Sequence, residues 1–225
     1  DPATGNARCT GVITREGMSA SRFGFGPDGK RLYLAVTAGF LHGQHPVRIY
    51  ERLGEGDYRL RTILSPHPWT PPGEKGRTGL RVWADANDDA AEQESEVRTF
   101  EMSLGGWLQG WYLSMAQDLS FYGCMYPIRV TGWTACGAPL YDPSKAAQIT
   151  DPAVLGNRGG YARRGLGSVD GRLMLFNSGY SMTHSTVDCY DIATGTLRWI
   201  YPSNFTGVHG SHHACGPEVG MIRGG

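Results

Sequence analysis

Residues that could bind a metal ion are concentrated in one short stretch of the chain, between Asp85 and Glu96. A calcium loop places oxygen ligands at positions 1, 3, 5, 7, 9 and 12 of about twelve residues, because Ca²⁺ needs about six to eight converging oxygens. In this stretch those positions hold, in order, Asp85, Asn87, Asp89, Ala91 through its carbonyl group, Gln93 and Glu96. The spacing therefore predicts a calcium site.

The neighbouring residues predict that this loop lies between two strands. Residues 80–83 have the pattern of a strand entering the loop, and residues 97–100 that of a strand leaving it. The sixth position is Ala90, where a calcium loop has glycine for a turn that a Cβ atom opposes. A solvated acidic turn is the alternative interpretation. A bound ion would be structural, holding a long loop in place, and would not by itself define a function.

The composition predicts that β-strands position this loop. The chain has 225 residues, of which 40% are hydrophobic and 19% charged, as in a globular protein. It contains 33 glycines, 13 prolines, 6 tryptophans and 11 tyrosines. Turn formers and aromatic residues in this abundance are typical of an all-β chain rich in turns.

Charge and hydropathy exclude two classes of partner. Basic and acidic residues number 21 each, so the net charge is zero and no basic excess indicates nucleic-acid binding. No apolar run approaches the roughly 18 residues that span a membrane.

Cys124 and Cys136 flank a predicted hairpin and are the best candidates for a disulfide. A disulfide, the use of calcium and a sequence that starts at Asp1 together predict an extracytoplasmic protein, either secreted or periplasmic. The chain is expected to be a mature form or a piece of a longer chain.

Strand units repeat along the sequence. Residues of about 20–65 have the pattern of four strands separated by polar turns, which is the size of one propeller blade. Further units are predicted at about 80–135 and 161–202. Residues 1–225 are thus expected to form one β-propeller-like domain of about three four-stranded units with long loops. Because propellers have about four to eight blades, the ring is expected to be incomplete, with further blades or another chain closing it.

Two motifs carry a resemblance to known repeats. Asp191, Thr194, Gly195 and Trp199 are similar to the Asp-x-x-Thr-Gly-x-x-x-Trp core of the tryptophan-docking repeat of quinoprotein-like β-propellers. Residues 25–33, Phe-Gly-Pro-Asp-Gly-Lys-Arg-Leu-Tyr, resemble a strand turn that is common in NHL-type propellers. The resemblance implies a propeller in which the Trp199 indole packs between blades. It says little about chemistry, because propellers host many functions.

Other residues could carry chemistry outside the calcium loop. His209, His213 and Cys215 are ligand types that suit zinc or copper, and His209 or His212 could act as a catalytic base. A loop whose histidines bond to the backbone is the alternative. Further candidates for ligand binding are an arginine pair that could hold an acidic group, one loop histidine, and two aromatic residues that could stack on sugar rings or fill a core: Arg163, Arg164, His184, Trp107 and Trp111.

Two classes of function fit these patterns. The first is an extracytoplasmic, calcium-stabilised β-propeller that acts as a binding or scaffold module for a glycan or a protein partner. The second is a propeller enzyme. It would be either a quinoprotein-like dehydrogenase, which the resemblance implies would use pyrroloquinoline quinone, or a polysaccharide lyase or hydrolase with His209 or His212 as base.

Overall fold

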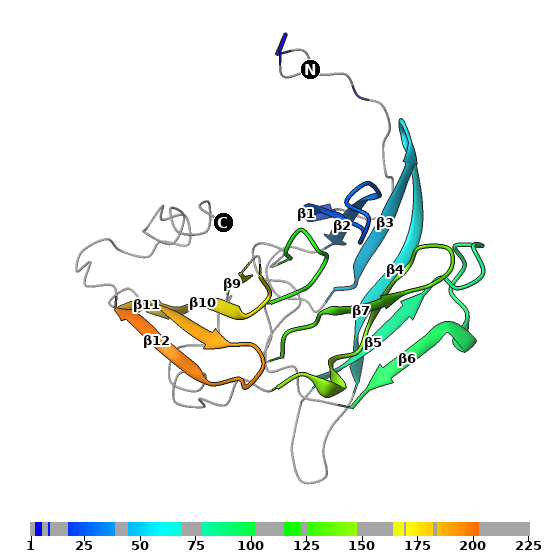
Figure 1. The fold of residues 1–225 in the computed structure, drawn as a ribbon. Helices are drawn as coiled ribbons and strands as arrows, with labels where there is room; N and C mark the ends of the chain where they lie inside the picture. Colours follow the sequence, from blue (N-terminus) through cyan, green and yellow to red (C-terminus); the bar gives the residue numbers. More distant parts are fainter. Residues whose placement is uncertain are drawn as a thin grey trace.

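The computed structural model describes residues 3–5, 9, 18–38, 45–68, 78–101, 115–122, 126–147, 164–168, 170–181 and 184–202. These residues form strands and two short 3-10 turns, so the all-β prediction is confirmed (Figure 1). Within the described ranges the strands form open antiparallel sheets and no closed ring of sheets. In the same ranges, no helix is long and apolar enough to cross a membrane.

The largest sheet has six antiparallel strands in chain order. They are β1 (Met18–Phe25), β2 (Leu32–Ala38), β3 (Val47–Gly54), β4 (Asp57–Pro68), β5 (Thr78–Ala84) and β6 (Val97–Phe100). The first four strands correspond to the predicted unit at about 20–65. β5 and β6, which come from the range of the predicted second unit, extend the same sheet, because β5 pairs with β4 from Thr62 opposite Ala84 to Pro68 opposite Thr78.

A smaller sheet and a hairpin complete the described fold. The four-stranded sheet has the order β12-β11-β10-β9 and contains β9 (Arg164–Gly167), β10 (Leu173–Ser181), β11 (His184–Asp191) and β12 (Leu197–Pro202). β7 (Val130–Trp133) and β8 (Pro139–Tyr141) form the hairpin. The Thr62 hydroxyl on β4 donates to the Pro139 carbonyl at 3.0 Å, which fixes the hairpin against the large sheet. The remaining elements are the 3-10 turns η1 (Glu94–Glu96) and η2 (Pro143–Lys145).

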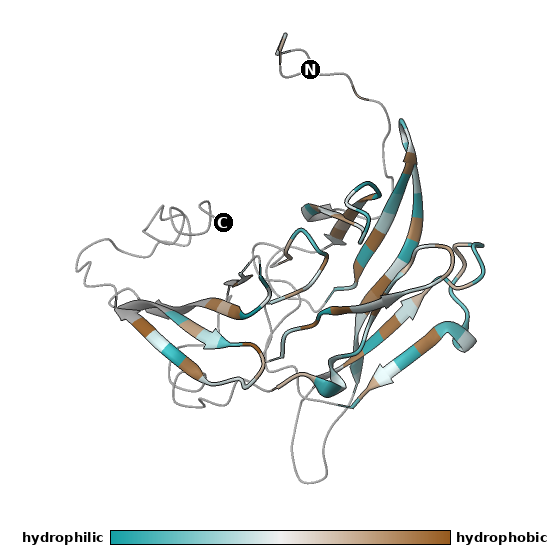
Figure 2. Ribbon diagram, viewed as in Figure 1, coloured by the Kyte–Doolittle hydropathy of each residue, from teal (hydrophilic) through white to brown (hydrophobic). Residues whose placement is uncertain are grey.

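Alternation along the strands buries both faces of the large sheet. On β3, Val47 and Ile49 point into one core, whereas Tyr50 points into another on the opposite face. Figure 2 shows this alternation as changes of colour along the strands. The second core contains Val36, Tyr50, Leu60, Ile63 and Trp83, and part of the acidic loop packs against it through Ala90. The loop is therefore held over a packed surface.

The motif that resembles the tryptophan-docking repeat forms a tight turn between β11 and β12. The Asp191 carboxylate accepts hydrogen bonds from the N–H groups of Ala193 and Thr194, at 3.0 and 3.2 Å, and Gly195 has a φ of 69°. Trp199 is 48% exposed on β12, the last strand of its sheet. The packing that the resemblance implies for its indole is therefore not made among the described residues.

Tyr122 packs closely against the small sheet, which gives a first testable prediction. A Cβ atom added at Gly167 would collide with the Tyr122 ring. Tyr122 is buried, in a cluster with Met174, Tyr190 and Ile192, so the ring has little room to move away. We expect Gly167→Ala to lower the free energy of unfolding by about 1–3 kcal/mol, as overpacking does. Urea titration checks this, and the double variant Gly167→Ala with Tyr122→Leu should recover part of the loss.

Candidate functional site

The acidic loop connects β5 to β6 and is closed at its base by both strands. Trp83 and Val97 are opposite each other in the β5–β6 register. Near the end of the loop, the Glu96 carboxylate accepts one hydrogen bond from the Ala86 N–H at 2.9 Å and another from the Trp83 indole N–H at 2.8 Å. Glu96, the predicted twelfth ligand position, thus reaches back to the second position of the loop and to the end of β5.

Asp85 anchors the start of the loop through all its polar groups. Its N–H donates to the Arg61 carbonyl at 2.9 Å, and its own carbonyl accepts from the Thr134 hydroxyl and the Cys136 thiol, each at 2.9 Å. Its carboxylate accepts from the Arg61 guanidinium and from the Asp88 N–H, each at 2.8 Å. Asp85 is fully buried, so the first position of the loop is fixed to β4 and to the turn of the β7–β8 hairpin.

The middle of the loop brings three predicted ligands together. The Asn87 amide donates to the Asp89 carboxylate at 3.0 Å, and the Gln93 amide donates to the same oxygen at 2.5 Å. The other Asp89 oxygen accepts from the Ala91 N–H at 2.8 Å. Ala90 has a φ of 56°, the left-handed conformation that a calcium loop requires at its sixth position. The backbone therefore makes the predicted turn despite the Cβ atom.

Arg61 on β4 joins this loop to the sheet through three carboxylates. Its guanidinium donates to Glu51 at 2.8 Å, to Asp85 at 2.8 Å and to Asp88 at 2.6 Å. The Arg61, Glu51 and Asp85 side chains are buried, whereas Asp88 is half-exposed and also bonds Arg59 at 2.8 Å. Buried charges persist when they are paired and hydrogen-bonded, as here.

The pKa shifts in this cluster follow from its geometry. Burial alone would lower the pKa of Arg61, but its bonds to Asp88, Glu51 and Asp85 raise that pKa overall. Hydrogen bonds from Arg59 and Arg61 lower the pKa of Asp88. Burial, and then the nearby charge of Glu51, raise the pKa of Tyr33 to about 12. Arg61 and Asp88 are therefore charged, and Tyr33 is neutral, at physiological pH.

The predicted ligands divide into two groups. Asn87, Asp89 and Gln93 converge at the exposed side of the loop, where the Asn87 and Gln93 amides donate to the Asp89 carboxylate and the Asn87 carbonyl accepts from the Asp89 N–H. Asp85 is turned toward Arg61. Its carboxylate lies within 4.8 Å of the ligand atoms of Asp88 and Cys136, which could form a second metal site, but the guanidinium already supplies a positive charge there. Carboxylate oxygens have two lone pairs, so the hydrogen bonds leave Asp89 and Glu96 able to bind an ion.

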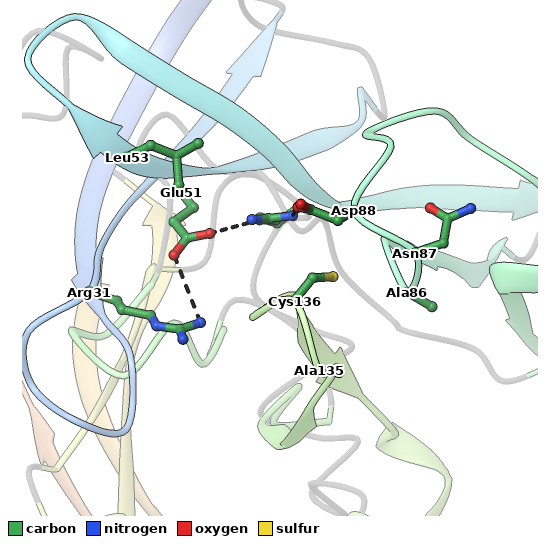
Figure 3. A pocket seen from close by; sticks show the side chains of 9 residues that line it. Arg31, Glu51, Leu53, Ala86, Asn87, Asp88, Ala135 and Cys136 are labelled. Atoms are coloured by element: carbon green, nitrogen blue, oxygen red, sulfur yellow. Dashed lines mark hydrogen bonds and ion pairs between the residues drawn. The ribbon is translucent and has the colours of Figure 1, made fainter.

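A shallow pocket lies beside the loop (Figure 3). Its volume is about 550 Å³. Its lining comes from the turn between β1 and β2, from β3 and β4, from the acidic loop, and from the turn between β7 and β8: Arg31, Glu51, Leu53, Arg61, Ala86, Asn87, Asp88, Ala135 and Cys136. The sequence patterns missed Arg31, Glu51, Arg61 and Cys136 as parts of one site. A charged residue at a buried strand position, as at Glu51 and Arg61, is the signal that could have identified two of them.

Most of the other predicted site residues lie outside the part of the chain that the structure describes. Arg163, Trp107, Trp111 and the segment with His209, His212, His213 and Cys215 lie outside the described residues. The backbones of Arg164 and His184 lie in β9 and β11, opposite Asn177 and Ser181. Cys136 is a free thiol, so the disulfide predicted with Cys124 is wrong.

No protein-family model matches the chain, and neither a curated protein nor a solved structure is detectably similar to it.

Proposed function

We propose that this chain is an extracytoplasmic, calcium-stabilised β-sheet module that binds or scaffolds a partner, with its sheets in a propeller-like arrangement. One observation carries the calcium part of this proposal. The two ends of the 85–96 loop are held together, because the Glu96 carboxylate at the twelfth position accepts a hydrogen bond from the Ala86 N–H at the second position. A calcium loop likewise brings its twelfth residue, a glutamate, back onto the ion that its earlier positions hold.

The conformation and charge of the loop add support. Ala90 adopts the left-handed turn needed at the sixth position, although this conformation is unfavourable for a residue with a Cβ atom. Asn87, Asp89 and Gln93 converge on the exposed side, and Glu96 is the remaining sequence-predicted carboxylate ligand besides Asp85 and Asp89. These four side chains would hold the ion, and Asp85 would fix the loop through Arg61. The ion would stabilise the loop and would do no chemistry.

Two further features support the arrangement and the location. Strands β9–β12 form a four-stranded antiparallel meander in chain order, which is the unit from which propellers are built. The six-stranded sheet departs from that unit by two strands. Loops of moderate calcium affinity suit extracellular modules, whose sites operate at high calcium concentration, with a Kd of about 10⁻⁴–10⁻³ M. A calcium site of this class would suit the extracytoplasmic location that is proposed.

The calcium proposal predicts that the free energy of unfolding rises with the calcium concentration. With Ca²⁺ at about one hundred times its Kd, the free energy of unfolding should rise by about 2.7 kcal/mol, because the ion binds only the folded loop. Urea titration after EDTA treatment, and again after calcium addition, measures this gain. Mass spectrometry of the native protein should find one calcium ion bound to each chain.

A matched pair of variants assigns the gain to the loop. Asp89→Ala should abolish the calcium-dependent gain, because Asp89 is the ligand at which Asn87 and Gln93 meet. Glu101→Gln removes one exposed carboxylate just beyond β6 and should leave the gain unchanged. Equal stability of the parent protein with calcium and with EDTA would contradict the proposal and leave the loop as an acidic turn closed by hydrogen bonds.

A further inference from the structure

The pocket beside the acidic loop has the chemistry of a small binding site. Its base is the buried ion pair between Arg61 and Glu51, at 2.8 Å, and its opposite wall is the turn between β7 and β8 (Figure 3). A volume of about 550 Å³ lies within the range of small-molecule sites, about 300–1,000 Å³.

The charges that line the pocket balance each other. Arg31 and Arg61 are positive and Glu51 and Asp88 are negative, so the net charge of the lining is zero. A ligand that carries a full charge would gain from one pair of residues and be repelled by the other. This balance favours a neutral ligand rich in groups that both donate and accept hydrogen bonds.

One gap in the hydrogen bonding shows where such a ligand would bind. The Glu51 side chain is only 8% exposed, and its first oxygen lies 3.8 Å from an Arg31 nitrogen, too far for a hydrogen bond. Its second oxygen is satisfied by Arg61. Within the described part of the chain no group is seen to donate a hydrogen bond to the first oxygen. A hydroxyl placed there could donate to Glu51 and accept from Arg31 at once.

The fold holds Arg31 open toward this position. Gly137, with a φ of 93°, lies against the Arg31 guanidinium, and a Cβ atom at Gly137 would collide with it. The Tyr33 hydroxyl donates to the Gly137 carbonyl at 2.7 Å and so fixes the turn. The Arg31 guanidinium also interacts with the Tyr33 hydroxyl. Its ion pairs to described residues are long, 3.9 Å from Asp28 and 3.8 Å from Glu51, so it keeps N–H groups for a ligand.

We propose that this pocket binds a neutral carbohydrate, with one sugar hydroxyl between Glu51 and Arg31. Leu53, which is 44% exposed in the pocket lining, supplies an apolar surface for the C–H face of the ring. This inference rests on the proposed binding function and specifies the class of ligand and its position. It does not depend on calcium, although Ala86, Asn87 and Asp88 of the acidic loop line one side of the pocket.

The test is a two-dimensional NMR titration of the full chain with maltose, cellobiose, lactose and xylobiose at millimolar concentration. At least one sugar should shift the amide signals of Ala86, Asn87, Ala135 and Cys136. Arg31→Ala should weaken that sugar about tenfold or more, because a hydrogen bond to a charged group is lost. Arg52→Ala, an exposed arginine on β3 outside the pocket lining, is the matched control and should leave the affinity unchanged.

The outcomes separate this inference from the calcium proposal. Absence of shifts with all four sugars would overturn it, and so would tighter binding of digalacturonate, which carries the charge that the pocket disfavours. A third result is that the sugar still shifts the amide signals in EDTA while calcium leaves the free energy of unfolding unchanged. That result would support sugar binding in the pocket and contradict only the calcium part of the proposed function.

Discussion

Replacing Arg61 with alanine is expected to lower the free energy of unfolding by about 3–5 kcal/mol. The guanidinium is the shared partner of Glu51, Asp85 and Asp88, at distances of 2.6–2.8 Å. Without it, the carboxylates of Asp85 and Glu51 would stay buried with no cation bonded to them. An uncompensated buried charge costs far more than the net contribution of an exposed ion pair.

Urea unfolding of Arg61→Ala and Arg61→Lys measures this cost. Lysine keeps the charge but lacks the planar guanidinium that bonds several carboxylates at once. The free energy of unfolding of Arg61→Lys should therefore lie between those of Arg61→Ala and the parent protein. Arg59→Ala is the matched control, because Arg59 is 38% exposed and its ion pair among the described residues is with Asp88. It should cost less than about 1 kcal/mol. A loss below about 1 kcal/mol for Arg61→Ala would mean that water replaces the guanidinium, contrary to the burial of the site.

Local pattern predicts much of the large sheet. The four strands predicted at about 20–65 correspond to β1–β4, which extend from Met18 to Pro68. Alternation succeeds here because each strand has two buried faces with distinct cores, which penalises a shift of register. The loop between two strands was also predictable, since the spacing of its oxygens lies within twelve neighbouring residues.

Contacts between distant parts of the chain were not predictable in this way. β5 pairs with β4, although residues 69–77 separate the two strands in the sequence. The sequence pattern predicts instead that a separate strand unit begins after that segment. Arg61 and Cys136 reach Asp85 from 24 and 51 residues away. Strand pairing and burial place such groups together, and neither leaves a local periodicity in a single sequence. The buried charges at Glu51 and Arg61 break the alternating pattern, and it is at that break that the site forms.

Replacing Trp83 with alanine is the second change with a large expected effect. Trp83 is fully buried in the core with Val36, Tyr50 and Ile63, and removal of such a side chain costs about 3–5 kcal/mol. Trp83→Phe keeps most of the ring and removes the N–H that donates to Glu96 at 2.8 Å. That change should cost about 1.5 kcal/mol, the lower end for a hydrogen bond to a charged group. Trp199→Phe, on an exposed ring, should change stability by less than about 0.5 kcal/mol.

A double-mutant cycle separates the hydrogen bond from packing. If the indole N–H orients Glu96, the costs of Trp83→Phe and Glu96→Gln should add to more than the cost of the double variant. Additive costs would show that the bond contributes nothing beyond ring volume. Because Glu96 is also the twelfth position of the loop, Trp83→Phe should reduce the calcium-dependent gain in stability without abolishing it. Asp89→Ala should abolish that gain, because Asp89 would bind the ion directly and Trp83 acts only by orienting a ligand.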